Sequence, residues 1–399
     1  MNAISLINRV KYNKTIYNLY FHIGSFILNR LKFFVKTDDR MIVFVSFGGR
    51  KYDDSPKAIY EAMLKDSRFD ECRLLWAFIR PDNYILPRGG KVKIDTFAYY
   101  KALLKARVWV TNSSMTRGLR FSGRKTFLLN TWHGSAIKRM GRDINEGNVS
   151  FGLKRRKYKF KNYTDLRLAQ GQYDVDIFSR AQNLPKDCFR IIGLPRNDEL
   201  ANTSSKLREE KKSKLGIPKR KKVILYAPTY REYDKDERNN VILTPALDLE
   251  KWREKLGSEY VLLFRAHYEV AKIMGVKDNG FVKNVSTYPY LNDLIIASDL
   301  LISDYSSIFF DYSIQGKPML CYCYDYDKYA EKRGMYFDIR EYLPYADNEE
   351  QLLELIQRAD DPEILEYAQR FQNKFVTAYG NASKKALNII HDFLKHNDD

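Results

Sequence analysis

Short apolar runs alternate with longer polar stretches along most of the chain. The first run, at residues 41–47, ends at the glycine pair Gly48-Gly49, and similar runs recur as far as residue 192. Continuous apolar runs bounded by turns are typical of strands that are covered on both faces of a parallel sheet. The pattern therefore predicts strands over residues 41–47, 72–79, 108–111, 127–131, 166–169 and 189–192.

A second series of the same kind begins after residue 222. Its apolar runs predict strands over residues 223–226, 260–264, 300–303 and 318–322. The amphipathic stretches between strands predict helices over residues 55–65, 175–183, 247–256, 291–298 and 305–314. Residues 349–396 are expected to be helical, and Pro362 and Gly380 divide them into three helices.

Two consecutive series of strands and helices predict an α/β protein with two Rossmann-like, doubly wound domains facing each other across a cleft. We expect a basic amphipathic segment over residues 1–40, a first domain over 41–200, and a second domain with terminal helices over 201–399. The length agrees with this division, because 399 residues exceed the usual size of one domain.

The positive charge of the chain is concentrated in three segments. The 68 lysines and arginines outnumber the 50 acidic residues and give a net charge of +18. Residues 1–40 carry a net +5, and residues 138–161 and 206–222 each carry +7, so the rest of the chain is almost neutral. Such clustering favours a polyanionic surface or a phosphate-bearing substrate over a uniform solubilising coat.

The first basic segment contains an uncharged run. Residues 15–29 carry no charge, but they are fewer than the ~20 apolar residues that a membrane-spanning helix needs. Basic residues flank the run on both sides, which fits a helix lying on an anionic membrane surface. A helix packed on the surface of its own domain is an equal alternative.

Common catalytic and metal-binding motifs are absent from the sequence. No G-x-G-x-x-G run follows the first strand, and no Walker, G-x-S-x-G or H-E-x-x-H sequence occurs. The four cysteines show no C-x-x-C spacing, which argues against a zinc site and predicts reduced thiols in the core. We therefore expect no cofactor and no clear metal site, although Mg²⁺ is not excluded.

His133 comes directly after the predicted strand at 127–131, in the run TWHGS. Gly134 permits a sharp turn there, and ligands of open α/β sheets bind at the carboxyl ends of the strands. A histidine in this place can act as a general base near neutral pH. The alternative is a structural histidine that hydrogen-bonds its own loop.

Two strand ends of the second half predict an anion site. Arg265 and His267 follow one strand two residues apart, and the fork of arginine donors matches phosphate geometry. Asp304, Ser306 and Ser307 lie between another strand and a helix, where the first N–H groups of the helix can bind phosphate. A salt-bridged arginine and a hydrogen-bonded histidine are the alternative for the first pair.

Two more strand ends carry an arginine beside a polar residue. Arg196 and Asn197 follow the strand at 189–192, and Thr229 and Arg231 follow the strand at 223–226. Four clusters of this kind together predict a cleft that binds a diphosphate, and hence a nucleotide-activated donor.

Six sequence runs occur together in one known family. They are TWHGSAIKRMGRD, GLPRND, YAPTYR, FRAHY, SDYSSIFFDYSIQGKPMLCYCYDYDKY and RGMYFD. In their order and spacing, over residues 40–345, the chain resembles the CDP-glycerol glycerophosphotransferase family, which contains teichoic acid primases and polymerases.

The resemblance implies a GT-B fold and an enzyme that transfers a polyol phosphate and releases CMP. The implied donor is CDP-glycerol or CDP-ribitol. The implied acceptor is an undecaprenyl-diphosphate-linked saccharide or a polyol-phosphate chain, reached from the cytoplasmic face of the membrane by a peripheral enzyme. His133 would be the base, with His267 as a second catalytic residue. Substrate binding would fall to Gly134, Ser135, Arg196, Asn197, Thr229, Arg231, Arg265, Asp304, Ser306, Ser307 and Asp311.

The chain departs from the family pattern after the histidine. Ser135, Ala136 and Ile137 stand where the family usually has Thr-Pro-Leu, so the hydroxyl is kept and the proline is not. The short N-terminal segment favours a primase-like enzyme over a polymerase. A GT-B glycosyltransferase that uses a nucleotide sugar is the alternative enzyme. A nucleic-acid-binding protein is the non-enzymatic alternative, but no RNA- or DNA-binding signature accompanies the charge.

Overall fold

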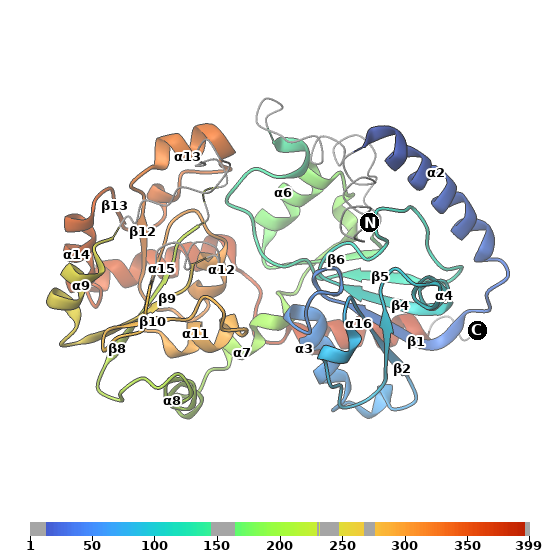
Figure 1. Cartoon of the computed structure of the whole chain (residues 1–399), viewed down its shortest axis with the longest axis horizontal. Coiled ribbons are helices and arrows are strands. Elements are labelled where there is room, and N and C mark those ends of the chain that lie inside the picture. Colours follow the sequence, from blue (N-terminus) through green and yellow to red (C-terminus); the bar gives the residue numbers. More distant parts are fainter. Residues whose placement is uncertain (1–12, 145–163, 230, 232–246, 267–275, 396–399) are drawn as a thin grey trace. The chain divides into compact units, whose positions relative to one another are not determined.

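The computed structural model describes residues 13–144, 164–229, 231, 247–266 and 276–395. The chain forms two compact units, each with its own parallel sheet (Figure 1). Unit 1 comprises Met1–His133, Gly141–Asp198 and Asn381–Asp399, and unit 2 comprises Gly134–Met140 and Glu199–Gly380.

The sheet of unit 1 has seven parallel strands in the order β3-β2-β1-β4-β5-β6-β7. They are β1 Asp38–Val45, β2 Arg73–Phe78, β3 Gly90–Lys93, β4 Ala106–Thr111, β5 Phe127–Asn130, β6 Leu166–Ala169 and β7 Phe189–Ile191. Successive residues of β1 enter different cores, because side chains of a strand alternate between its faces. Ile42 and Phe44 pack into one core and Val43 and Val45 into the other, which explains why the strand is apolar throughout.

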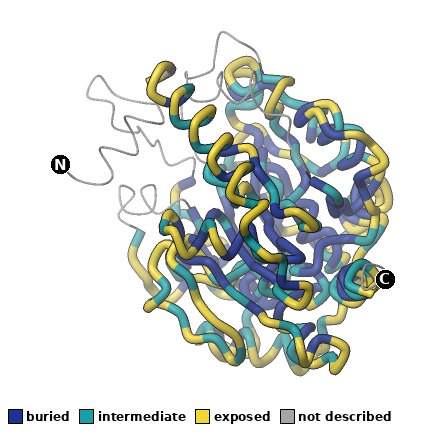
Figure 2. The backbone as a smooth tube through the Cα atoms, turned by 90° about the vertical axis from the view of Figure 1, so that its right-hand side faces the viewer, coloured by how far each residue is buried: buried dark blue, intermediate teal, exposed yellow. Residues whose placement is uncertain are grey.

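Helices cover both faces of this sheet. Helix α3 (Asp54–Met63) and helix α16 (Ala382–Lys395) share the core on one face. Helix α4 (Phe97–Lys105) and Leu28 of helix α2 (Lys14–Leu31) belong to the core on the other face. Helix α6 (Gln172–Gln182) follows β6. The central strand β4 is buried along its whole length. Figure 2 shows buried segments in dark blue running through the interior.

The sheet of unit 2 has six parallel strands in the order β10-β9-β8-β11-β12-β13. They are β8 Lys222–Ala227, β9 Tyr260–Phe264, β10 Val282–Asn284, β11 Leu300–Ser303, β12 Met319–Tyr322 and β13 Tyr345–Ala346. Helix α7 (Asp198–Ala201) begins at the last residue of unit 1. The other described helices of unit 2 are α8 Ser205–Lys214, α9 Leu249–Leu256, α11 Leu291–Ala297, α12 Ile308–Ser313, α13 Tyr326–Arg333, α14 Glu349–Gln357 and α15 Pro362–Phe375.

The predicted α/β class with two Rossmann-like units is confirmed. Every predicted strand is present. The three predicted terminal helices are present as well: α15 begins at Pro362, and Gly380 lies between α15 and α16. Strands β3, β10 and β13 were not predicted, because they are short and two of them contain lysine. Helices α4, α7, α8 and α13 were not predicted either.

The two units differ from the predicted ranges 41–200 and 201–399 at two places. Helix α16 packs within unit 1, where Ala386, Leu387 and Ile390 enter the core. Asp198 accepts hydrogen bonds from the N–H groups of Ala382 and Ser383 at 2.8 and 2.7 Å, which satisfies the first turn of α16.

The second difference is the segment Gly134–Met140, which belongs to unit 2. The N–H of Tyr336 donates to the carbonyl of Ile137 at 2.8 Å, and the N–H of Arg139 donates to the carbonyl of Gly334 at 3.0 Å. The chain therefore leaves unit 1 at His133 and joins unit 2 at the next residue.

The basic stretch 206–222 is partly paired with acidic residues of unit 2. Arg208 forms an ion pair with Asp299, while Lys211 and Lys214 lie 2.5 and 3.0 Å from the two carboxylate oxygens of Asp293. Part of the positive charge of this stretch is therefore balanced by ion pairs between α8 and acidic residues elsewhere in unit 2. Of the basic stretch 138–161, only residues 138–144 are described.

Candidate active site

The turn after β5 carries His133. The N–H of Thr131 donates to the carbonyl of Thr111 at 2.7 Å, and the N–H of Trp132 donates to Oδ1 of Asn130 at 2.9 Å. Trp132 has a φ of +54°, a left-handed conformation that costs a non-glycine residue on the order of 1 kcal/mol or more. Gly134 follows with a φ of +137°. Such strain is typical of a functional turn.

The imidazole of His133 has a defined tautomer. Its Nδ1 lies 2.7 Å from the main-chain carbonyl of Asn112. Because a carbonyl can only accept, Nδ1 must carry the proton, which leaves Nε2 as the basic nitrogen. The ring stacks on Trp132 with a centroid distance of 4.2 Å, and the ring of Phe47 lies 5.8 Å away. His133 is therefore held in a fixed orientation, and in its neutral form Nε2 is the nitrogen without a proton.

Burial lowers the pKa of His133 below its usual value of 6.5. The hydrogen bond to Asn112 and the negative charge of Asp54 oppose this effect, whereas the positive charges of Arg196 and Arg167 add to it. The lowered pKa keeps the imidazole neutral at pH 7, which is the form that a general base requires.

Arg196 and Asn197 lie in unit 1 with His133. Nη1 of Arg196 donates to a carboxylate oxygen of Asp54 at 2.7 Å and to the carbonyl of His133 at 2.9 Å. Asn197 is buried, and its Nδ2 donates to Oε1 of Gln170 at 2.9 Å. Arg196 thus contacts the main chain of the histidine turn, while Asn197 joins a buried polar network. Their substrate-binding role stays a prediction.

In unit 2, three predicted clusters lie at one edge of the sheet. Strands β9, β8 and β11 are neighbours, so the residues that follow them meet at the carboxyl edge. The N–H of Thr229 donates to Oδ1 of Asp304 at 2.9 Å. Nη1 of Arg265 donates to the carbonyl of Tyr288 at 2.8 Å. The structure therefore brings Thr229, Asp304 and Arg265 to the same edge.

The guanidinium of Arg231 is buried among carboxylates. Its Nη1 donates to Oδ2 of Asp304 at 2.8 Å, and its Nε and Nη2 donate to Asp325 at 2.8 and 2.9 Å. Tyr305 also donates to Asp325, at 2.9 Å. These bonds make Arg231 a cross-link between Asp304, in the turn after β11, and Asp325, in the turn after β12.

The hydroxyl residues of the predicted anion site stand before α12. Oγ of Ser306 accepts a hydrogen bond from the N–H of Ile308 at 3.3 Å, and Ser307 is the residue before the helix. Asp311 is buried inside α12, and Ser135 is buried in the segment of unit 2 that begins with Gly134. Their binding roles stay predictions. His267 lies outside the described residues.

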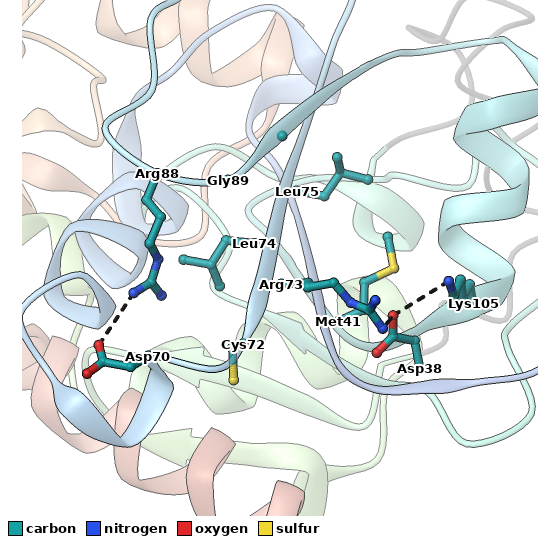
Figure 3. Close-up of a pocket in the computed structure, with 11 residues that line it drawn as sticks. Asp38, Met41, Asp70, Cys72, Arg73, Leu74, Leu75, Arg88, Gly89 and Lys105 are labelled. Atoms are coloured by element: carbon teal, nitrogen blue, oxygen red, sulfur yellow. Dashed lines mark hydrogen bonds and ion pairs between the residues drawn. The ribbon is translucent and has the colours of Figure 1, made fainter.

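A pocket of about 400 Å³ lies in unit 1, away from the His133 turn. It is lined by residues at the amino ends of β1, β2 and β3 (Figure 3). His133, by contrast, follows the carboxyl end of β5. Its charged residues pair with one another: Lys105 and Arg73 with Asp38, and Arg88 with Asp70. The pocket holds none of the predicted site residues.

Two negative observations apply to the described residues alone. No group of three or more histidine, cysteine or acidic side chains there is arranged to hold a metal ion. No described helix is both long and apolar enough to cross a membrane.

Sequence reasoning missed three residues around His133. Asn112 supplies the carbonyl that fixes the tautomer, Asp54 pairs with Arg196, and Arg167 lies 4.2 Å from the ring centroid of Trp132. Asp54 had one signal in the sequence, an acid immediately before the Ser55-Pro56 helix start. Nothing local marks Asn112, because its contribution comes from the main chain.

Similar proteins act in teichoic acid synthesis. The chain is 32% identical over 368 residues to a teichoic acid glycerol-phosphate transferase of Staphylococcus aureus, covering 88% of this chain and 92% of the relative. It is 33% identical over 373 residues to a teichoic acid poly(glycerol phosphate) polymerase of Staphylococcus epidermidis, covering 89% of this chain. The chain spans about half the length of that polymerase, 51%.

Solved structures of other proteins have the same fold as this chain. A variant of the wall teichoic acid polymerase TagF with CDPG matches with a TM-score of 0.83 and 29% identity, covering all of both chains. A UDP-GlcNAc 2-epimerase from Neisseria meningitidis, at 12% identity and a TM-score of 0.53, covers 88% of this chain and 99% of that one and shares the fold alone.

The family model described as CDP-glycerol:poly(glycerophosphate) glycerophosphotransferase matches residues 27–392. This match covers both sheets and every predicted site residue. It confirms the predicted resemblance and the prediction of a transferase. The chain belongs to the CDP-glycerol glycerophosphotransferase family.

Proposed function

We propose that this chain transfers glycerol phosphate, or another polyol phosphate, from a CDP-polyol to a hydroxyl group in teichoic acid synthesis. The acceptor is a lipid-linked saccharide or a polyol-phosphate chain, and CMP is released. The names of the relatives include glycerol-phosphate and ribitol-phosphate enzymes, which supports a CDP-polyol donor. Family membership argues against a nucleotide-sugar glycosyltransferase and against a nucleic-acid-binding protein.

The observation that carries the proposal is the fixed tautomer of His133. Nδ1 donates to Asn112, so Nε2 is the atom that can take a proton. In the proposed step, the acceptor hydroxyl gives its proton to Nε2 while its oxygen bonds to the phosphorus of the polyol phosphate. The bond from that phosphorus to the bridging oxygen breaks, and CMP leaves with the bonding electrons.

The leaving group acquires negative charge in this step, so cationic and N–H donors are needed around the diphosphate. Arg265 follows β9, and the serines Ser306 and Ser307 follow β11; these two strands flank β8 in the sheet of unit 2, and the three residues are our candidates for this role. We extend the proposal to His267 and to Gly134, Ser135, Arg196, Asn197, Thr229, Arg231, Asp304 and Asp311 as further catalytic or substrate-binding residues.

A donor panel tests the reaction. Labelled CDP-glycerol, CDP-ribitol and common sugar nucleotides are each incubated with the chain and a lipid-linked disaccharide acceptor, and CMP and product mass are measured. We expect CMP and a product heavier by one or more polyol phosphates. Turnover of a sugar nucleotide alone would contradict the proposal. The product mass also distinguishes one addition from many.

His133→Ala tests the base. Loss of general base catalysis is expected to lower transfer by about a hundred- to ten-thousand-fold. Binding of CDP-glycerol, measured by calorimetry, should stay within about twofold of the wild type. The matched control is His22→Ala, which changes an exposed histidine of the same unit. Transfer by His133→Ala at the wild-type rate would remove His133 from this role.

Membrane docking through α2 is the second part of the proposal. One face of this helix packs on unit 1, where the hydroxyls of Tyr17 and Tyr20 donate to the carbonyls of Gly118 and Arg117, both at 3.2 Å. Large apolar side chains of α2 and the turn that follows it face solvent: Leu19 is 61% exposed, Phe26 61% and Phe34 85%, along with Ile23, Ile27 and Phe33.

Both readings of the N-terminal segment therefore receive support, since α2 packs on its own unit and also presents an apolar stripe. Lys32 and Lys36 lie beside this stripe, and basic residues next to apolar ones favour an anionic membrane surface. We propose a peripheral enzyme at the cytoplasmic face of the membrane.

Sedimentation with phosphatidylglycerol vesicles tests this docking. Replacing both Phe26 and Phe34 with serine removes the insertion of two aromatic side chains, and we expect vesicle affinity to fall by about tenfold or more. The matched control is Ile85→Ser, which removes an apolar side chain that is 93% exposed elsewhere in unit 1. Equal binding by the double variant and the wild type would overturn the docking proposal.

A further inference from the structure

Asp54 stands out among the residues around His133 because of its backbone conformation. It is the first residue of α3 and has a φ of +65°, in the left-handed region that non-glycine residues seldom adopt. The side chain is buried, although aspartate is normally exposed. A strained and buried acid persists only where its surroundings hold it in place.

The carboxylate of Asp54 is held by two donors. Oδ1 accepts a hydrogen bond from the N–H of Ser55 at 2.6 Å, and Oδ2 accepts one from Nη1 of Arg196 at 2.7 Å. The same Nη1 donates to the carbonyl of His133 at 2.9 Å. A single nitrogen therefore links the carboxylate to the main chain of the proposed base.

Three charged side chains of unit 1 act on the imidazole of His133. Arg196 follows β7, Arg167 belongs to β6, and Asp54 begins α3. The two arginines disfavour the protonated ring and lower the pKa of His133, whereas Asp54 favours the protonated ring. Asp54 is thus the anion among them, and burial strengthens its effect because the local dielectric is low.

We propose that Asp54 is a positioning residue for the base His133: through Arg196 it fixes the main-chain carbonyl of the histidine, and its charge stabilises the imidazolium formed on proton transfer. This inference rests on the proposed function. When the acceptor hydroxyl gives its proton to Nε2, the ring becomes a cation in a half-buried place that already contains two arginines. The carboxylate of Asp54 offsets part of that cost.

Asp54→Asn tests the inference with little change of shape. Asparagine adopts the left-handed conformation readily and has almost the same volume, so the variant removes the charge and keeps the turn. We expect kcat to fall about tenfold, with CDP-glycerol binding unchanged. The acid limb of the pH profile of kcat/KM should move to lower pH, because removing an anion lowers the pKa of His133.

A second measurement does not depend on turnover. Titration of the His133 imidazole by NMR in Asp54→Asn should show the same movement to lower pH, whatever the rate of the variant. Asp54→Gly is the second variant, because glycine also adopts a positive φ but lacks the carboxylate. The matched control is Asp70→Asn, which changes an acid of unit 1 at the other edge of the sheet and should leave the His133 titration unchanged.

Two results would overturn the inference. One is a wild-type rate in both Asp54 variants. The other is a slower rate with no movement of the His133 titration, which would reduce Asp54 to a structural part of the turn. Failure of the proposed function would look different, because His133→Ala would then keep its turnover while the NMR titration of Asp54→Asn still moved.

Discussion

Each unit buries an arginine near a turn that carries predicted site residues, but the two arginines have opposite kinds of partner. In unit 2, Arg231 lies beneath the Asp304 turn with two carboxylates, which accept three charge-assisted hydrogen bonds from it at 2.8–2.9 Å. In unit 1, Arg167 is only 1% exposed and stacks on aromatic rings, with its guanidinium carbon 4.2 Å from the ring centroid of Trp132 and 5.2 Å from that of Phe178. Its Nε and Nη2 have no hydrogen-bond partner in the described part of the chain.

The difference is visible in the acidity of the two side chains. Burial alone lowers the pKa of an arginine, and it lowers the pKa of Arg167 to about 9. Burial acts in the same direction on Arg231, but the charges of Asp304 and Asp325 outweigh it and raise the pKa. In unit 2 the charge of Arg231 is thus neutralised by the carboxylates that it cross-links. In unit 1 the cation Arg167 lies near the neutral His133 without a carboxylate that outweighs its burial.

The largest expected effect is on the unit 2 cross-link. Arg231→Ala would leave the buried carboxylate of Asp304 and the half-buried carboxylate of Asp325 without their cation. Breaking a buried pair typically costs about 3–5 kcal/mol. We expect a loss of this size in the free energy of unfolding, measured by urea titration. The control is Arg253→Ala, which removes an exposed ion pair with Glu250 and should cost less than about 1 kcal/mol. Equal losses in both variants would remove the distinction between buried and exposed pairs.

Arg167→Met should have a much smaller effect on stability. Methionine fills a similar volume and stacks on the same rings, and replacing a buried charge by an apolar side chain is often neutral or stabilising. The lost cation–π contacts are worth about 1–2 kcal/mol, which the removed burial cost of the charge offsets. We expect the free energy of unfolding to change by less than about 1 kcal/mol. A loss near that of Arg231→Ala would show that both arginines act as structural cross-links.

The smallest expected effect is on the titration of His133. Arg167 disfavours the imidazolium, so Arg167→Met should raise the pKa of His133 and move the acid limb of kcat/KM toward higher pH. This movement is opposite to the one expected for Asp54→Asn. The pH profiles of both variants, measured at one ionic strength, check the signs. If the acid limbs of Arg167→Met and Asp54→Asn moved in the same direction, the opposite charges of the two side chains could not explain the pKa of His133.

Local burial patterns explain why the strands were predictable. The apolar runs of both sheets are buried on two faces, and this makes each run visible without knowledge of its neighbours. Strands β3 and β10 lie at sheet edges, where polar residues are tolerated, so no apolar run marks them. Helix α16 was predicted as a helix, but no local pattern could assign it to unit 1, because its partner Asp198 lies far away in sequence.

The candidate site was also predictable only in its local part. The position of His133 after a strand followed from the sequence, and so did the arginines and hydroxyl residues at other strand ends. The partners of these residues did not. Asp54 and Arg196 are 142 positions apart, and Arg231 and Asp325 are 94 apart. No periodicity extends over such distances.

The sequence by itself determined the two α/β units, the histidine at the end of β5, and a family that the match over residues 27–392 confirms. The tertiary structure alone decided which nitrogen of His133 carries its proton, which buried arginine meets carboxylates, and that Arg208, Lys211 and Lys214 are paired internally. The physical reason is that the burial pattern of a strand or helix depends on residues that are close in sequence. Hydrogen bonds and ion pairs depend on which distant segments the fold brings together.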